Sequence, residues 1–258
     1  RDTEDEHLIS IFGKTEDGKS VCLTTSFTPY FFVKLPDNID NAKVQRIYSI
    51  LDEKCRDSLV AYSVMKSKDL WGFQNNEEFV FMKLNFKHLQ ARRLVDSFLR
   101  KPLDKTPELF NIFGTRNVKV YESNLDPVLR LMHRTGIQST GWLDTGDKCT
   151  RAHLAQVDLD LFCNDWTSLK PVARDDIAPF VVASVDIECN SSTGKFPDAD
   201  IPGDACFQIA ISLCNFGTDE PYDKTCLCYK KTDPNLEGCD IRSYDTEREM
   251  LEAFQKYL

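Results

Sequence analysis

The sequence predicts an α+β domain over residues 1–175, followed by the first part of an α/β domain over residues 176–258. Strand and helix patterns alternate through the first region. A polar stretch at 164–179 contains Pro171 and Pro179, which is typical of a boundary between domains. The nearly continuous apolar run 180–185 then predicts a strand covered on both faces, the kind found in α/β sheets.

The first hundred residues are predicted to form a sheet with two helices. Asp17 and Gly18 lie between two β-type runs and indicate a hairpin. Asn38 or Asp40 can cap the first helix, because apolar residues then recur at helical spacing. The predicted elements are strands at 8–12, 20–24 and 30–35, a helix through about 53, strands at 59–65 and 79–86, and a helix at 88–99. This order is typical of an α+β sheet domain. Basic residues from Lys87 to Lys105, including Arg92, are interpreted as a solvated helix face, with contact to a nucleic-acid backbone as the alternative.

The next segment continues the mixed pattern. A strand is predicted at 118–121, and a helix follows with Pro127 in its first turn and Gly136 at its end. Residues 141–143 then lead through a polar turn to a strand at 154–162.

Charge and cysteine usage limit the class of protein. The formal net charge is −9, which argues against a small basic nucleic-acid-binding domain but allows an enzyme with acidic metal ligands. No apolar run is long enough to span a membrane, so no membrane partner is expected. The ten cysteines include no Cys-x-x-Cys pair and fit reduced thiols in the cytosol or nucleus. Cys226 and Cys228 are interpreted as one face of a strand, with a metal half-site as the alternative.

Asp186 and Glu188 are the candidate functional residues. They end the apolar run that predicts a buried central strand, and side chains two residues apart point to the same side of a strand. Like charges at such a place repel each other and are costly to desolvate. A divalent cation removes that penalty, and hard oxygen ligands suit Mg²⁺ or Mn²⁺. The pattern alone leaves open a solvated strand face without metal.

Several ordered motifs carry a family resemblance. Residues 183–189 (Ala-Ser-Val-Asp-Ile-Glu-Cys) resemble the first exonuclease motif of family B DNA polymerases, especially those of the delta type and of large DNA viruses. In that family a Gly-x-Phe-Pro element, an aspartate and a Gln-Ile-Ala strand follow. Here Gly194-Lys195-Phe196-Pro197, Asp204 and Gln208-Ile209-Ala210 stand in the same order. The segments at 29–32, 121–124, 141–142 and 246–251 are also similar to family segments, so the resemblance covers nearly the whole chain.

The resemblance implies a DNA-directed DNA polymerase acting in DNA replication. Residues 1–175 would be its N-terminal domain, and 176–258 the start of a ribonuclease H-like 3′→5′ proofreading exonuclease domain. Asp186 and Glu188 would be catalytic: Asp186 would bridge two Mg²⁺ or Mn²⁺ ions, and Glu188 would bind one and help orient the attacking water. Implied partners are DNA primer-template and single-stranded DNA, with a sliding-clamp processivity factor as a further candidate. The implied location is the nucleus or a viral replication site. Phe196 and Phe207 are expected to pack in the core, with an approach to the frayed 3′ base as the alternative.

The family's second and third exonuclease motifs and its polymerase motifs do not occur in these 258 residues. Two of the family's four exonuclease carboxylates are therefore missing, and Asp198, Asp200 and Asp240 fit no family motif. We expect a fragment of a longer polymerase that is nearly inactive alone. Two alternatives are a stand-alone ribonuclease H-like exonuclease, which would need further acidic motifs, and a non-catalytic module that binds single-stranded nucleic acid or a protein partner.

Overall fold

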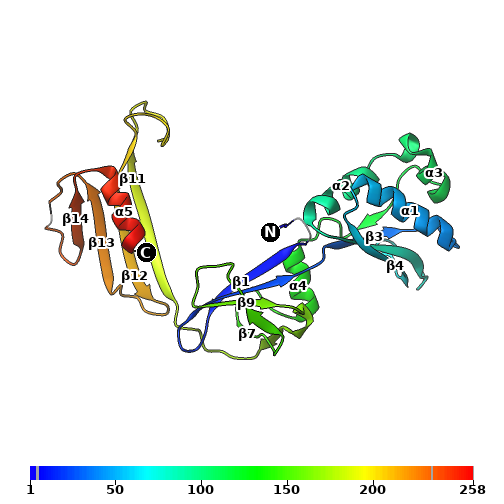
Figure 1. The fold of residues 1–258 in the computed structure, drawn as a ribbon, viewed down its shortest axis with the longest axis horizontal. Coiled ribbons are helices and arrows are strands. Elements are labelled where there is room, and N and C mark those ends of the chain that lie inside the picture. The colour runs from blue at the N-terminus through cyan, green and yellow to red at the C-terminus, as the bar shows by residue number, and fades with distance from the viewer. Residues whose placement is uncertain (4–5, 234, 258) are drawn as a thin grey trace. The chain divides into compact units, whose positions relative to one another are not determined.

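The computed structural model describes residues 1–3, 6–233 and 235–257. The predicted mixed fold class is confirmed: both strands and helices form the fold (Figure 1). The chain forms two compact units, one of residues 1–13 and 19–176, the other of residues 14–18 and 177–258. The assignment of 1–175 and 176–258 to two polymerase domains stays a prediction.

The first unit contains a four-stranded sheet with the order β4-β5-β3-β6. Its strands are β3 (Tyr30–Lys34), β4 (Leu59–Ser67), β5 (Phe79–Phe86) and β6 (Val120–Tyr121). β3 pairs antiparallel with both β5 and β6. Helices α1 (Asn41–Lys54) and α2 (Leu89–Leu99) pack against this sheet.

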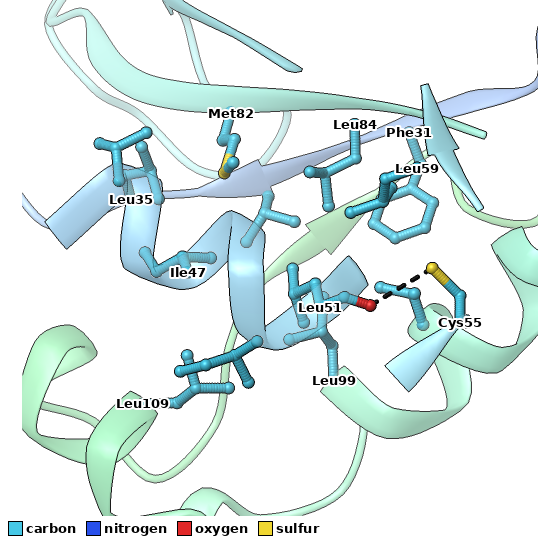
Figure 2. Packing of buried hydrophobic residues seen from close by; sticks show 14 of the residues in the cluster. Phe31, Leu35, Ile47, Leu51, Cys55, Leu59, Met82, Leu84, Leu99 and Leu109 are labelled. Atoms are coloured by element: carbon cyan, nitrogen blue, oxygen red, sulfur yellow. Dashed lines mark hydrogen bonds between the residues drawn. The ribbon is translucent and has the colours of Figure 1, made fainter. Parts of the chain in front are cut away.

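The core of this sheet follows from alternation along its strands. Phe31 and Leu84, which lie opposite each other on β3 and β5, are fully buried and face Leu51 of α1 (Figure 2). The aromatic rings of Phe31 and Phe86 stack with centroids 5.0 Å apart. Burial of this apolar face gives the sheet and its helices one continuous core.

Local capping fixes where these helices begin. Asp40 is the N-cap of α1, and its carboxylate accepts a hydrogen bond from the N–H of Lys43 at 2.8 Å. The Nδ1 of His88 accepts from the N–H of Ala91 at the start of α2. After a short 3₁₀ turn (Leu103–Lys105), α3 (Pro107–Phe113) ends at Gly114, whose φ of 61° lies in the left-handed region.

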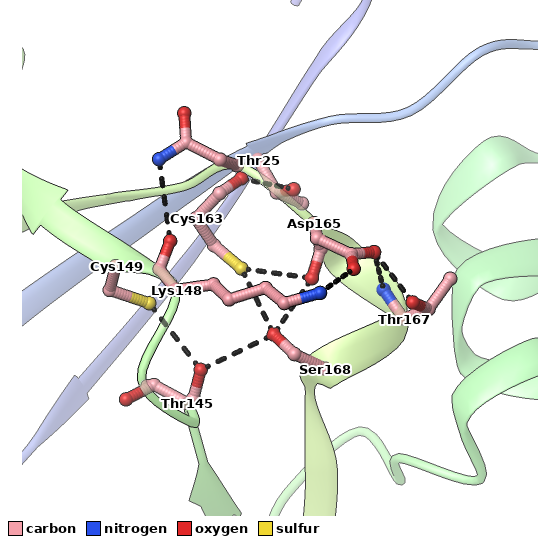
Figure 3. A network of polar contacts seen from close by, with 9 residues as sticks. Thr25, Thr145, Lys148, Cys149, Cys163, Asp165, Thr167 and Ser168 are labelled. Carbon is pink, nitrogen blue, oxygen red and sulfur yellow. Dashed lines mark hydrogen bonds and ion pairs between the residues drawn. The ribbon is translucent and has the colours of Figure 1, made fainter.

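A second sheet of the first unit has the order β1-β2-β9-β8. Its strands are β1 (Leu8–Lys14), β2 (Ser20–Ser26), β8 (Cys149–Arg151) and β9 (Leu159–Cys163), and β7 (Trp142–Asp144) pairs separately with β10 (Lys170–Val172). Helix α4 (Pro127–Thr135) is capped by Asp126 and ends at Gly136. Asp165 accepts hydrogen bonds from Lys148 Nζ at 2.5 Å and from the N–H of Thr167 at 3.0 Å, and so ties the loop before β8 to the 3₁₀ turn Trp166–Ser168 (Figure 3).

Two sequence-based expectations for this unit were wrong. The predicted strand at 154–162 begins only at Leu159, and β8 was not predicted. The polar stretch at 164–179, predicted as a domain boundary, also contains a 3₁₀ turn and β10, because Pro171 lies in a short strand whose partner is β7. Arg92 is buried: its Nη1 donates to the carbonyl oxygen of Leu125 at 2.6 Å, which the sequence pattern of α2 does not reveal.

The second unit is a four-stranded sheet, β11-β12-β13-β14, with helix α5 packed against it. The elements are β11 (Val181–Asn190), β12 (Ala205–Asn215), β13 (Asp223–Tyr229), β14 (Asp240–Tyr244) and α5 (Glu247–Tyr257). β11, β12 and β13 pair antiparallel, and β13 pairs parallel with β14. Met250 of α5 contacts Ile209, Ile211 and Leu227, which form the buried core of this unit. Within the described ranges, no helix is long and apolar enough to cross a membrane.

Candidate active site

Strand β11 carries both predicted site residues. Asp186 lies opposite Ala210 of β12, and Glu188 lies opposite Gln208. Since Ile209 and Ile211 point toward α5, the alternating side chains of Asp186 and Glu188 point to the other face of the sheet. The structure therefore brings the two carboxylates together on one face, as their spacing predicted.

The setting of β11 differs from the prediction of a central strand covered on both faces. β11 is the edge strand of its sheet in the described part of the chain, and residues 181–188 are exposed. Its apolar side chains therefore meet solvent in this structure; Ile187, for example, is 56% exposed. An apolar run indicates a strand but does not reveal which neighbours will cover it.

The two carboxylates are available as ligands. Among the residues that the structure describes, neither forms an ion pair, and Asp186 Oδ1 accepts one hydrogen bond, from the N–H of Ile187 at 3.1 Å. The described residues contain no group of three or more His, Cys, Asp or Glu side chains that could hold a metal ion. Asp186 and Glu188 thus offer the oxygen donors that a hard divalent cation prefers. They supply only two of the ligand residues that such a site needs.

A hollow of about 400 Å³ lies beside Asp186. Ser184, Ser212 and Lys224 contribute to its lining, whereas Glu188 does not. Lys224 did not stand out in the sequence, because its relation to Asp186 arises only from the pairing of β12 with both β11 and β13.

The loop between β11 and β12 is organised by Asp204. Its Oδ1 accepts from the N–H and hydroxyl of Ser192, at 2.5 and 2.7 Å, and its Oδ2 accepts from the N–H of Asp198 at 3.1 Å. These hydrogen bonds, chiefly those from Ser192, lower the pKa of Asp204. Asp204 is the aspartate of the ordered motifs that resemble the family. In this structure it holds the loop in place.

Phe196 and Phe207 do not pack in the core, contrary to expectation. Phe196 lies in this loop and is 92% exposed. Phe207 is 39% exposed and is skipped by the pairing of β11 with β12: Glu188 lies opposite Gln208, but Cys189 lies opposite Cys206. Phe207 is thus the extra residue of a β-bulge directly beside Glu188.

The segment around Thr246 has a structural role. Thr246 and Glu249 exchange hydrogen bonds between side chains and backbone N–H groups at 3.1 and 3.2 Å, which is a capping box at the start of α5. Glu247 Oε1 accepts from the N–H of Cys206 at 2.8 Å and so links α5 to the bulged end of β12.

Cys226 and Cys228 lie on one face of β13, as the alternation predicted. Their sulfur atoms are 3.6 Å apart, and Nε2 of Gln208 donates to Cys226 Sγ at 3.0 Å. Both residues are buried free thiols. Burial, opposed by the hydrogen bond from Gln208, raises the pKa of Cys226 to about 11, so this thiol is protonated at neutral pH.

Comparison with known proteins places the chain among polymerases. Residues 118–258 match the model of the family "DNA polymerase family B, exonuclease domain", a match that starts within the first compact unit. A DNA polymerase of Acanthamoeba polyphaga mimivirus is 31% identical over 99% of this chain, which spans 16% of that protein. The DNA polymerase delta catalytic subunit of Schizosaccharomyces pombe is 26% identical over 97% of the chain, which spans 23% of it.

The structure of the family B DNA polymerase from the archaeon Pyrobaculum calidifontis shares the fold. It aligns with the whole chain at a TM-score of 0.63 and 16% identity, and the chain covers 28% of it. The family match extends over more than half of the present sequence. The chain therefore belongs to the family B DNA polymerases and includes the region of their exonuclease domain.

Proposed function

We propose that Asp186 and Glu188 are metal-binding catalytic residues of a 3′→5′ proofreading exonuclease within a DNA-directed DNA polymerase. One observation carries this proposal: two exposed carboxylates share a face of β11, without a cationic partner among the described residues, in an exonuclease-family chain. The substrate would be the 3′ end of a primer on its template, unpaired as single-stranded DNA. A sliding clamp is the further partner that we propose, and the nucleus or a viral replication site is the location.

The donor set suits Mg²⁺ or Mn²⁺, because both ligands are carboxylates. When bound, such ions activate a water and stabilise the leaving 3′ oxygen of the phosphodiester. The N–H of Ile187 holds one oxygen of Asp186 and so restricts the orientation of that carboxylate. Glu188 lies directly beside the bulge at Phe207.

We expect the 258-residue chain alone to lack significant exonuclease activity, because two carboxylates provide an incomplete two-metal site. The test is excision of a 3′-mismatched, fluorescently labelled primer in the presence of Mn²⁺. Robust excision by the wild-type chain that is abolished in Asp186→Ala would contradict this expectation.

Metal binding can be measured without catalysis. Titration of the ¹⁵N-labelled chain with Mn²⁺ should broaden the amide signals of Ile187 and Ala210 before those of the first unit. The double variant Asp186→Asn/Glu188→Gln should lose this selective broadening. Asp219→Asn, which removes an exposed carboxylate from a turn of the same unit, should retain it.

The same titration distinguishes the alternatives. Equal broadening in the wild type and the double variant would mean that Asp186 and Glu188 do not bind the ion. That result would favour a non-catalytic module that binds single-stranded nucleic acid or a protein partner. Robust excision by the isolated chain would instead favour a stand-alone exonuclease.

A further inference from the structure

Cys189 and Cys206 form a cross-strand pair at the end of the β11–β12 ladder. They lie directly opposite each other on antiparallel strands, and both are free and half-buried. Side chains directly opposite each other on antiparallel strands have Cβ atoms about 4.5–5.5 Å apart. The Cys206 thiol donates to the carbonyl oxygen of Gln208 at 3.5 Å. The two cysteine side chains are therefore neighbours and partly accessible to a small reagent.

The backbone geometry suits a disulfide. The N–H of Cys206 donates to Glu247 Oε1 at 2.8 Å, an arrangement that fits a non-hydrogen-bonded antiparallel pair. In such pairs the Cα atoms are about 4.5 Å apart. Disulfides span Cα separations of about 4.4–6.8 Å, so the strands need not move far for the bond to form.

The position of the pair connects it to the candidate active site. Cys189 follows Glu188 in the chain, and Cys206 precedes the bulge residue Phe207. A bulge bends its strand and sets the direction of neighbouring side chains. A covalent bond from Cys189 to Cys206 would close the ladder immediately beyond the bulge and restrict the backbone that carries Glu188.

We propose that Cys189 and Cys206 are a reversible thiol–disulfide pair, oxidised by peroxide, that fixes the bulge beside Glu188. One thiolate attacks a peroxide oxygen, the O–O bond breaks, and a sulfenic acid forms as the released hydroxide takes a proton to become water. The second sulfur then attacks the sulfenic sulfur, the S–O bond breaks, and a second water leaves. Two thiols and one hydrogen peroxide thus give one disulfide and two waters. An external dithiol reverses the reaction by thiol–disulfide exchange. The effect on Glu188 as a metal ligand rests on the function proposed above, whereas the disulfide does not.

The surroundings of the Cys206 thiol affect the rate of this reaction. Burial, followed by the charge of the neighbouring Cys189 sulfur, raises the pKa of Cys206 to about 11. Oxidation should therefore be slow at neutral pH and faster in alkaline solution.

The other cysteines provide comparisons within the same chain. Cys149 and Cys163 are also directly opposite each other on antiparallel strands, but Cys163 is completely buried (Figure 3). Its thiol donates to the carbonyl oxygen of Asp165 at 3.3 Å. This pair should oxidise more slowly than Cys189 and Cys206, because the reagent must reach a sulfur closed off from solvent. Cys214 lies opposite Val182 and has no thiol across the ladder.

The test is peptide mapping of the 258-residue chain after hydrogen peroxide treatment at pH 8.5 and blocking of the remaining thiols. Trypsin cleaves after Lys195, so Cys189 lies alone in peptide 175–195, while Cys206 and Cys214 lie in peptide 196–224. We expect these peptides to be disulfide-linked, and dithiothreitol to separate them. Cys206→Ser should abolish the link, and Cys214→Ser, a change in the same peptide, should preserve it.

Absence of the linked peptides under conditions that oxidise other thiols of the chain would overturn the proposal. A link that survives in Cys206→Ser and disappears in Cys214→Ser would also overturn it. The amide signal of Glu188 provides a second measurement. It should shift on oxidation in the wild type and not in Cys206→Ser, and an unchanged signal in an oxidised, linked chain would refute the effect on the bulge.

Discussion

Two sheets of this protein contain strands of similar composition in different surroundings. One sheet is covered by α1 and α2, and the other is covered by α5. In the first, β3 lies between β5 and β6, and every second side chain is buried under the helices. In the second, β11 has β12 as its only strand partner among the described residues, and its valines and isoleucine are exposed. Apolar strand residues therefore contribute to stability according to the neighbours that the fold provides, and not according to their side chains alone.

The buried sheet should respond most strongly to truncation. Phe31→Ala removes a completely buried ring that stacks on Phe86, and we expect unfolding of the first unit to become easier by about 3–5 kcal/mol. Phe12→Ala, which truncates an exposed phenylalanine of β1, should change stability by less than about 0.5 kcal/mol. Urea unfolding, monitored by hydrogen exchange of the β3 and β5 amides, measures the stability of both variants. Equal losses for the two variants would contradict the burial seen at these positions.

A matched pair of isoleucines tests the second sheet directly. Ile209 and Ile187 lie opposite each other, but Ile209 is 1% exposed and Ile187 is 56% exposed. We expect Ile209→Ala to destabilise the second unit by about 2–5 kcal/mol and Ile187→Ala by less than about 1 kcal/mol. Hydrogen exchange of β12 and β13 amides resolves the unit from the rest of the chain. A large effect of Ile187→Ala would show that β11 is covered in solution.

Asp69 provides a smaller, pH-dependent contribution to the first unit. Its carboxylate, only 4% exposed, accepts from Lys34 Nζ at 2.7 Å and from the hydroxyl of Tyr121 at 2.6 Å. Burial opposes ionisation, but hydrogen bonds from Lys34, Tyr121 and the N–H of Leu70 outweigh it and lower the pKa to about 2. The lowered pKa means that the stabilisation is complete above the ordinary value of 3.8 and is lost as the pH falls toward 2.

Asp69→Asn should therefore cost about 1–2 kcal/mol near pH 7, because it removes the charged acceptor. The difference between the wild type and the variant should shrink between about pH 4 and pH 2. Urea unfolding across that range measures it. Asp37→Asn, at an exposed position of the same unit, is the control and should show no comparable difference. A difference that is independent of pH would exclude ionisation of Asp69 as the cause.

The sequence predicts local features of both sheets better than it predicts their surroundings. Hairpin, cap and stop signals such as Gly18, Asp40 and Gly136 act within a few residues, and the structure contains the corresponding turns and helix ends. The shared face of Asp186 and Glu188 follows in the same way from strand alternation. These features depend on neighbours in the chain, so a single sequence is sufficient to predict them.

The features that were not predicted depend on partners distant in sequence. The exposure of Ile187 depends on which elements of the fold lie beside and above β11. Burial of Arg92 depends on the carbonyl oxygen of Leu125, and the bulge at Phe207 depends on the register between two strands. The bulge also places Cys189 opposite Cys206, and no residue pattern in either strand indicates this pairing.

The N-terminal cap of α5 depends on residues close together in the sequence, and it supports the sheet that contains the exposed strand β11. Thr246→Ala removes the hydroxyl that accepts from the N–H of Glu249, and we expect a loss of about 1 kcal/mol in the second unit. Thr246→Ser keeps a hydroxyl at that position and should retain most of the stability. Hydrogen exchange at Glu249 and Met250 reports the first turn of the helix directly. Because Met250 seals the core formed with Ile209 and Leu227, faster exchange in that turn should be accompanied by faster exchange in β12. Equal exchange in the alanine and serine variants would show that the hydroxyl does not hold α5 on its sheet.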